Sequence, residues 1–276
     1  MPMPRIATVD FLNARPLVRG FTHGDQRGVF ELLRGTPARC AEWLRSGQAE
    51  VALIPSIEYL RIPSLSVLPG MAIASRKQAR SVLLVSRVAA PDIRSVALDS
   101  SSRTSAALLR ILLERRSRHR VSYREMEPAL GPMLEHCDAA LLIGDAALKA
   151  ETSSLKVYDL AAEWHAMTGL PFVFAFWAVR PGADLPLAAG PFLQSRREGL
   201  ARLDTIAAEA AVELGLPASE LGDYLRSNIH YDLGPEEIRG LWLFYRFARE
   251  SSLVAAAREV VLYGGEAGRA QMGGVA

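Results

Sequence analysis

The chain has 276 residues, half of them hydrophobic, which is enough for a sizeable core in one or two domains. Its formal net charge is only +2, and no basic run or zinc-finger spacing occurs, so nothing indicates a nucleic-acid partner. Cys40 and Cys137 lie far apart without a CxxC pair, so we expect reduced, buried thiols. With no signal segment and no apolar stretch long enough to span a membrane, we expect a soluble cytoplasmic protein with no membrane partner.

Short apolar runs alternate with helix-like stretches over the first 180 or so residues, which is typical of an α/β protein. We expect strands at 5–9, 29–33, 51–54, 81–86, 94–98, 121–123, 139–143, 155–159 and 172–179. We expect helices at 37–46, 106–113, 129–135, around Trp164, and at 190–214, 218–227 and 235–250. From residue 186 onward only helices are expected, and the last twelve or so residues, rich in Gly and Ala, are expected to be frayed.

Two long apolar runs, 81–86 and 172–179, are natural crossings between two blocks of alternating strands and helices. We therefore expect two lobes with a cleft between them, and a helical C-terminal segment that returns to the first lobe. The expected boundaries are 1–85 plus 178–276 for the first lobe and 86–177 for the second.

Segment 98–105 joins an expected strand to an expected helix and carries four serines, a threonine and an arginine. The first N–H groups of a helix lack internal partners and carry the positive end of its dipole, so they attract anions. Capping by Ser101 or Ser102 explains one serine, but not the whole cluster. We therefore expect a ligand carboxylate here, bound by Ser101, Ser102, Arg103, Thr104 and Ser105.

Other expected strands also end in polar corners, at Asn13, Ser56 and Asp145, the last directly after Gly144. Because ligands of open α/β sheets bind at the carboxyl ends of strands, we expect these corners to face a common cleft. Each has a plainer interpretation: Asn13 can stabilise its own turn, and Ser56 and Asp145 can cap helices. Ser81, at the first crossing, is expected near the cleft.

Several common enzyme signatures are missing from the sequence. GxGxxG does not follow the first strand, and neither GxxxxGK[ST], HExxH nor GxSxG occurs anywhere. The five histidines are scattered. Dinucleotides, nucleoside triphosphates, metal ions and serine-hydrolase chemistry are therefore not indicated.

Together the motifs resemble a known family. Asp-Phe-Leu-Asn-Ala-Arg-Pro-Leu at 10–17 is similar to the Tyr-Leu-Asn-x-x-Pro-Leu opening of chorismate dehydratase from the futalosine-type menaquinone pathway, with Phe11 where tyrosine is usual. The resemblance continues, in chain order, through 53–60, 98–105, 142–148, Trp164, 168–174 and 228–233.

This resemblance implies the two-lobed fold of periplasmic type 2 binding proteins and the dehydration of chorismate to 3-[(1-carboxyvinyl)oxy]benzoate, with no cofactor or metal. Ser81 and the serine cluster would hold the substrate's carboxylates, and Asn13 would orient the leaving hydroxyl or the enolpyruvyl group. The base would be the substrate's own enolpyruvyl carboxylate or, as a second candidate, Asp145. Thr168 and Gly169 join the expected substrate-binding residues through the same resemblance.

Three rival interpretations share the expected fold. A transport receptor needs an export signal, and the sequence shows none. The effector-binding module of a regulator needs an attached DNA-binding segment, and the first expected strand begins too early to leave room for one. The sister enzyme of the pathway, 1,4-dihydroxy-6-naphthoate synthase, opens with a Ser-Pro-Cys-Pro-Asn type of motif. Here the same place has Asp10-Phe11-Leu12-Asn13, with no cysteine, which favours the dehydratase.

Overall fold

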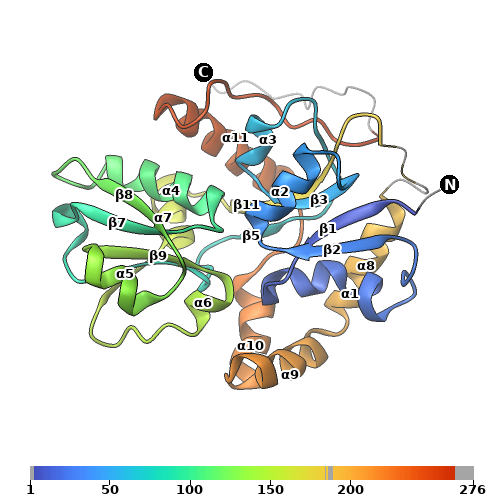
Figure 1. The fold of residues 1–276 in the computed structure, drawn as a ribbon, viewed down its shortest axis with the longest axis horizontal. Helices are drawn as coiled ribbons and strands as arrows, with labels where there is room; N and C mark the ends of the chain where they lie inside the picture. The colour runs from blue at the N-terminus through green and yellow to red at the C-terminus, as the bar shows by residue number, and fades with distance from the viewer. Residues whose placement is uncertain (1–2, 184, 186–188, 265–276) are drawn as a thin grey trace.

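Two mixed β-sheets flanked by helices form the computed structural model, which describes residues 3–183, 185 and 189–264 (Figure 1). The first sheet has the order β2 (Glu31–Gly35), β1 (Arg5–Val9), β3 (Val51–Pro55), β11 (Phe172–Val179) and β4 (Ser66–Val67), and β5 (Ile73–Ser75) also pairs with β11. The second sheet has the order β10 (Lys156–Asp159), β6 (Val82–Ser86), β9 (Ala139–Ile143), β7 (Ser95–Asp99) and β8 (Ser122–Met126).

Helices cover both sheets. The elements grouped with the first sheet are η1 (Leu12–Ala14), α1 (Arg15–His23), α2 (Pro37–Arg45), α3 (Glu58–Arg61), α8 (Gly190–Leu200), α9 (Leu203–Leu214), α10 (Ala218–Asp223), η3 (Tyr224–Asn228) and α11 (Pro235–Glu250). Those grouped with the second are η2 (Ala90–Asp92), α4 (Arg103–Glu114), α5 (Leu130–His136), α6 (Gly144–Leu148) and α7 (Leu160–Thr168).

Local sequence explains the central elements. Every residue of β3, β9 and β11 is buried, as expected of strands covered on both faces. Helix α2 begins where the sequence predicts: the Thr36 side chain accepts a hydrogen bond from the N–H of Arg39, and Pro37 occupies the first turn. The expected α/β class is therefore confirmed.

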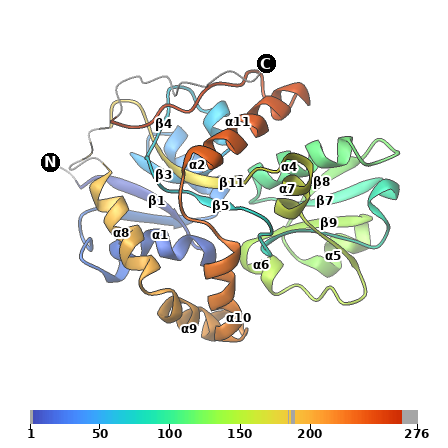
Figure 2. The same cartoon turned by 180° about the vertical axis from the view of Figure 1, so that it is seen from behind.

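The C-terminal helices return to the first sheet, as expected (Figure 2). Helix α8 lies against α1, where Ser195 Oγ donates to the Leu17 carbonyl (2.8 Å) and accepts from the Gly20 N–H (3.0 Å). A Cβ at Gly20 would lie 2.6 Å from Ser195 Cα, so this close approach requires glycine.

Some element boundaries differ from the expected ones. The second strand is displaced by two residues to Glu31–Gly35, and the expected helix at 190–214 is interrupted between α8 and α9. The expected helix at 218–227 ends at Asp223 and continues as the π-helical segment η3. The expected fraying at the C-terminus concerns residues 265–276, which lie outside the described residues.

Strand pairing bears on the two lobes. β6 pairs with β9 and β10 in the second sheet, whereas all of β11 pairs in the first. The expected boundaries at 85/86 and 177/178 therefore fall at the ends of crossing strands that each belong to one sheet. We propose that the lobes follow the two sheets, with the boundaries between them just before β6 and just before β11.

Among the described residues, no helix has the length and apolar character needed to cross a membrane.

Candidate active site

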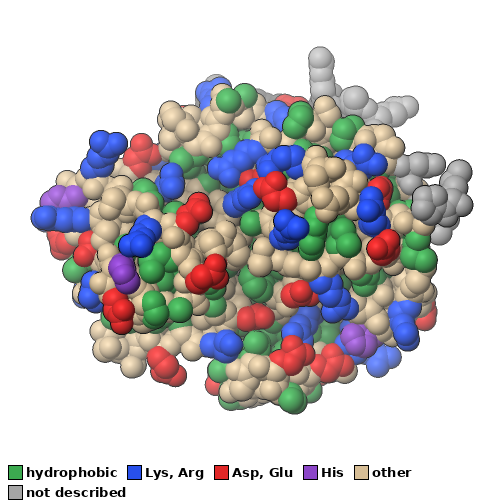
Figure 3. Space-filling view, in the orientation of Figure 1, with side chains coloured by type: hydrophobic (Ala, Val, Ile, Leu, Met, Phe, Trp, Pro, Cys, Tyr) green, Lys and Arg blue, Asp and Glu red, His purple; other side chains and the backbone are tan. Residues whose placement is uncertain are grey.

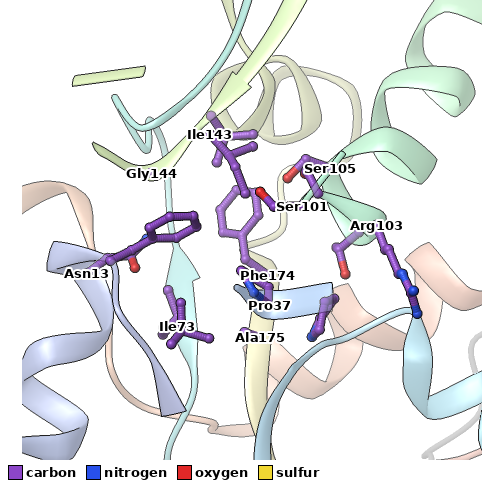
Figure 4. Close-up of a pocket in the computed structure, with 16 residues that line it drawn as sticks. Asn13, Pro37, Ile73, Ser101, Arg103, Ser105, Ile143, Gly144, Phe174 and Ala175 are labelled. Atoms are coloured by element: carbon purple, nitrogen blue, oxygen red, sulfur yellow. The ribbon is translucent and has the colours of Figure 1, made fainter. Parts of the chain in front are cut away.

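A cavity lies between the two sheets and contains about 480 Å³ of space free of protein atoms, part of it open to solvent. Its lining comes from both sides of the molecule: Val9, Phe11, Asn13, Pro37, Pro55, Ile73, Phe174 and Ala175 from the first sheet and its helices, and Val82, Ser101, Ser102, Arg103, Thr104, Ser105, Ile143 and Gly144 from the second. Figure 4 shows Asn13 on one side, Ser101 and Ser105 on the other, and Phe174 between them.

The serine cluster lies at the start of α4 and lines the cavity. Ser102 is the N-cap of α4, yet its side chain makes no capping hydrogen bond, and its buried Oγ has no partner among the described residues. Buried hydroxyls are rarely left unpaired, so this one is available to a ligand. Ser105 lines the cavity from the first turn of the same twelve-residue helix. Hydroxyls and free helix N–H groups thus converge on one wall.

Ser101 is held within its own corner. Its N–H and Oγ both donate to Asp99 Oδ1, at 2.9 and 2.6 Å. Burial raises the pKa of Asp99, and the hydrogen bonds from Ser101 oppose that rise. Ser101 therefore shapes the loop and also lines the cavity.

Thr104 and Ser56 connect the two sides of the molecule. Thr104 Oγ1 accepts from the Ile57 N–H at 3.1 Å and lies 3.4 Å from Ser56 Oγ. Ser56 Oγ donates to the Val173 carbonyl at 2.8 Å, and Ser56 is not among the lining residues. Both hydroxyls have protein partners, which leaves them less available to a ligand than Ser102.

The guanidinium of Arg103 is also engaged by protein. It donates to Glu58 Oε2 at 3.0 Å and to Glu42 Oε1 at 2.7 Å. The carboxylate of Glu58 is fully buried and pairs with Arg45 and Arg61 as well. In Figure 4 the Arg103 side chain extends away from the centre of the cavity. Arg103 thus fastens α4 to α2 and α3 through its charge, and it is also one of the lining residues.

Gly144 brings main chain to the cavity opposite the serines. Its φ is +57°, and an added Cβ would lie 2.8 Å from the Phe11 ring, so both conformation and space require glycine. Its N–H donates to the Ser81 carbonyl at 2.8 Å. The Phe11 ring therefore closes over Gly144, next to the half-buried Asn13.

Asp145 is not among the residues that line the cavity. Its Oδ1 accepts from the Leu12 N–H at 3.0 Å, so the carboxylate caps η1 and not its own helix. Burial raises the pKa of Asp145, against the hydrogen bond from Leu12 and the charge of Arg15. The carboxylate thereby holds the loop that carries Asn13.

The remaining expected residues lie outside the lining. Ser81 is buried, and its Oγ accepts from the Tyr224 hydroxyl at 2.8 Å. Thr168 Oγ1 donates to the Trp164 carbonyl at 2.8 Å, and Gly169 ends α7 with a φ of +70°. Thr168 and Gly169 thus terminate a helix.

Sequence reasoning did not single out Tyr224, or Ile73 and Ile143, which form an apolar wall of the cavity together with Phe174; aromatic residues of the 172–179 strand are expected in the core and the cleft wall. Tyr224 lies in a segment with the pattern of an ordinary helix, and only the structure shows its contact with Ser81.

Among the described residues, no group of three or more His, Cys, Asp or Glu side chains could hold a metal ion. On the face in Figure 3, basic side chains lie among acidic ones.

Two solved structures share this architecture. Protein AF1704 from Archaeoglobus fulgidus has a TM-score of 0.73 and 19% identity, covering 91% of this chain and 98% of that one. The alkanesulfonate-binding protein SsuA from Xanthomonas axonopodis pv. citri, bound to MOPS, has a TM-score of 0.65 and 16% identity, covering 94% and 96%. The protein is therefore of the two-lobed, periplasmic-binding-protein-like class, with a largely apolar cavity between its sheets that carries hydroxyl groups on one wall.

The model of a family described as menaquinone biosynthesis matches residues 4–250. The chorismate dehydratase of Thermus thermophilus is 36% identical over 234 residues, which cover 78% of this chain and 85% of that relative. The chain belongs to this menaquinone-biosynthesis family, and the resemblance to chorismate dehydratases is confirmed.

Proposed function

We propose that this protein is a chorismate dehydratase, a carbon–oxygen lyase that converts chorismate to 3-[(1-carboxyvinyl)oxy]benzoate and water. The observation that carries the proposal is the buried hydroxyl of Ser102, at the start of α4 beside the cavity, which has no hydrogen-bond partner in the part of the chain that the structure describes. Chorismate carries two carboxylates, and a helix N-terminus with free hydroxyls is suited to one of them. The relationship to a chorismate dehydratase supports the choice of substrate.

In this proposal the side chains that bind a carboxylate are Ser102 and Ser105, with the first N–H groups of α4. Arg103 contributes by holding the start of that helix against Glu42 and Glu58, and the Thr104 hydroxyl does so through Ile57. Asn13, on the opposite side of the cavity, holds the ring hydroxyl that leaves. The apolar wall near Phe174 excludes water from the ring.

The reaction needs little chemistry from the protein. The C–H bond at the carbon bearing the enol ether breaks, and its electron pair forms a new ring double bond as the C–O bond to the neighbouring hydroxyl breaks. The proton and the hydroxide leave together as water, and the ring becomes aromatic. Because formation of the aromatic ring drives this step, positioning of the substrate and electrostatic stabilisation by the protein are sufficient to catalyse it.

We assign the base to the substrate's own enolpyruvyl carboxylate. The Asp145 carboxylate accepts the Leu12 N–H and is not part of the lining, which disfavours it as the acceptor of a proton from the substrate. The proposal includes no cofactor or metal. It also includes a cytoplasmic location, supported by the relationship to a biosynthetic enzyme.

The test is to incubate purified protein with chorismate and a metal chelator, and to follow the mixture by liquid chromatography and mass spectrometry. We expect a product lighter than chorismate by one water, absent from a sample without protein. Unchanged chorismate from a folded sample would contradict the proposal. Loss of turnover on adding the chelator, restored by a divalent cation, would contradict its metal-free form.

A further inference from the structure

We propose that residues 251–264, which follow α11, form a strap that holds α3 in place and so positions the start of α4 beside the cavity. Arg258 is the main positioning residue of this strap. Its effect on substrate binding rests on the function proposed above, but its effect on α3 does not.

The strap is fixed to β4, the last strand of the first sheet. Val67 of β4 donates its N–H to the Val261 carbonyl and accepts a hydrogen bond from the Tyr263 N–H, both at 2.8 Å. These two bonds form a parallel bridge between Val67 and Leu262. The path of the strap along the sheet is therefore set by main-chain hydrogen bonds.

Arg258 holds the C-terminal end of α3. Its Nη2 donates to the carbonyls of Tyr59 and Ile62, the latter at 2.8 Å. The last carbonyls of a helix lack partners within the helix and carry the negative end of its dipole, so a guanidinium beside them is stabilising. A helix of four residues has little stability of its own, and α3 therefore depends on such contacts.

Tyr59 is enclosed by the strap and by α11. Its hydroxyl donates to the Glu259 carbonyl and accepts from the Val261 N–H, both at 2.9 Å. The Arg258 guanidinium lies 4.0 Å from the centre of the Tyr59 ring. The Tyr245 ring of α11 is stacked on the same ring, with centres 6.1 Å apart. Because Tyr59 is fully buried among these groups, α3 cannot shift without breaking contacts with the strap.

The beginning of α3 contacts the start of α4. The N–H of Ile57, the N-cap of α3, donates to Thr104 Oγ1 at 3.1 Å. The carboxylate of Glu58, its first residue, accepts from the Arg103 guanidinium at 3.0 Å. Arg103 and Thr104 directly follow Ser102, whose hydroxyl binds a carboxylate in the proposed function. A displaced α3 would therefore displace the wall of the cavity that binds the ligand.

Arg115 supplies a matched control. Its guanidinium also lies over an aromatic ring, 4.4 Å from the centre of Phe247, and also donates to a helix carbonyl, that of Ile111 at 3.2 Å. It is the C-cap of α4, whose 12 residues begin at Arg103, so it lies about 18 Å along the axis from the start of that helix. Arg258→Met and Arg115→Met remove the same group, and Arg258→Lys keeps the positive charge beside α3.

Hydrogen exchange followed by mass spectrometry tests the strap without any substrate. We expect peptides covering 56–62 and 101–107 to exchange about fivefold faster in Arg258→Met and less so in Arg258→Lys. Both peptides should be unchanged in Arg115→Met. Thermal unfolding verifies that each variant is folded, and should Arg258→Met not fold, Arg258→Lys is judged by the same two peptides.

Two results of this exchange experiment would overturn the inference. Unaltered exchange at 56–62 would mean that the strap does not hold α3. Faster exchange at 56–62 without any change at 101–107 would mean that α3 does not position α4.

Kinetics with chorismate test the effect on the site. Arg258→Met should raise KM about three- to tenfold and change kcat less than about twofold, because a displaced α4 binds the carboxylate less well in the ground state and the transition state alike. Arg115→Met should keep both values. Equal KM values for the two variants would contradict the effect of the strap on the site. Absence of chorismate turnover by the unchanged protein would overturn the proposed function, and the exchange rates would still decide the strap.

Discussion

The β7–α4 corner and the β9–α6 corner have the same position on neighbouring parallel strands, but they use their polar residues differently. At β7–α4, Ser102 and Ser105 line the cavity, and Ser102 Oγ is unpartnered within the described part of the chain. At β9–α6, Ile143 and Gly144 line the cavity, and the Asp145 carboxylate, which is not part of the lining, accepts a hydrogen bond from the Leu12 N–H.

The difference follows from the cost of burying each group. A buried carboxylate without a hydrogen bond is far more costly than a buried hydroxyl, and Asp145 accordingly accepts a hydrogen bond from the Leu12 N–H at the start of η1. A hydroxyl can remain unpaired until a ligand arrives. In the proposed function, the β7–α4 corner contacts the ligand directly, and the β9–α6 corner acts through the loop that carries Asn13.

The largest effect should come from that loop. We expect Asn13→Ala to lower kcat for chorismate by about 10²- to 10³-fold, because it removes the group that holds the leaving hydroxyl. Steady-state kinetics would measure it, with thermal unfolding as the check on folding. Turnover at the normal rate would mean that Asn13 has no catalytic role. The β9–α6 corner would then have no catalytic side chain to position.

Ser102→Ala and Ser101→Ala should separate ligand binding from stability within the first corner. Ser102→Ala should raise KM about tenfold, the effect of losing about 1.4 kcal/mol of binding, with no loss of stability, since its Oγ has no protein partner within the described residues. Ser101→Ala should lower the free energy of unfolding by about 1–3 kcal/mol, because it breaks the bond to Asp99. An unchanged KM in Ser102→Ala would mean that this hydroxyl binds no carboxylate.

Arg103 and Arg45 contact the same two glutamates, but only Arg103 belongs to α4. We expect Arg103→Met to raise KM less than about tenfold and to lower the free energy of unfolding by about 1 kcal/mol, since the pair is partly exposed. Arg45→Met should alter stability similarly and leave KM unchanged. A KM about 100-fold higher in Arg103→Met would instead indicate direct contact with a substrate carboxylate.

Local signals in the sequence predict most of the fold. Thr36 and Pro37 fix the start of α2, and the apolar run of β11 marks a crossing strand. The serine-rich start of α4 predicts an anion site from residues within one turn of each other. These features depend on near neighbours, so they can be predicted without knowing the tertiary structure.

Other features depend on residues far away in the chain. The guanidinium of Arg103 pairs with Glu58 and Glu42, which are 45 and 61 positions away, so the sequence alone suggested a ligand contact. Asp145 similarly finds Leu12 across 133 positions. An ionisable side chain pairs with an oppositely charged group or a hydrogen-bond donor that folding brings close to it. Because that partner lies far away in the sequence, no local sequence pattern predicts it.

Asp145→Asn should have the smallest effect on turnover. The amide oxygen can still accept the Leu12 N–H, so the Asn13 loop should stay in place and kcat should remain within about threefold of its original value. Near-normal turnover would exclude Asp145 as the base. A loss of about 10³-fold with the fold intact would restore it as a candidate.

The same variant should change how stability depends on pH. Because burial raises the pKa of Asp145 above its ordinary value of 3.8, the folded protein holds this proton at pH values where the unfolded chain has lost it. The unchanged protein should therefore lose stability relative to Asp145→Asn as pH rises from 3.8 through the raised pKa, and the difference should then level off. Urea unfolding across that range measures this difference in stability.

Asp138 should give a difference of the opposite sign. Burial works to raise the pKa of its carboxyl, but hydrogen bonds from Arg94 and Ser95 lower the pKa overall. The unchanged protein should therefore gain stability relative to Asp138→Asn as pH rises through the lowered pKa towards 3.8.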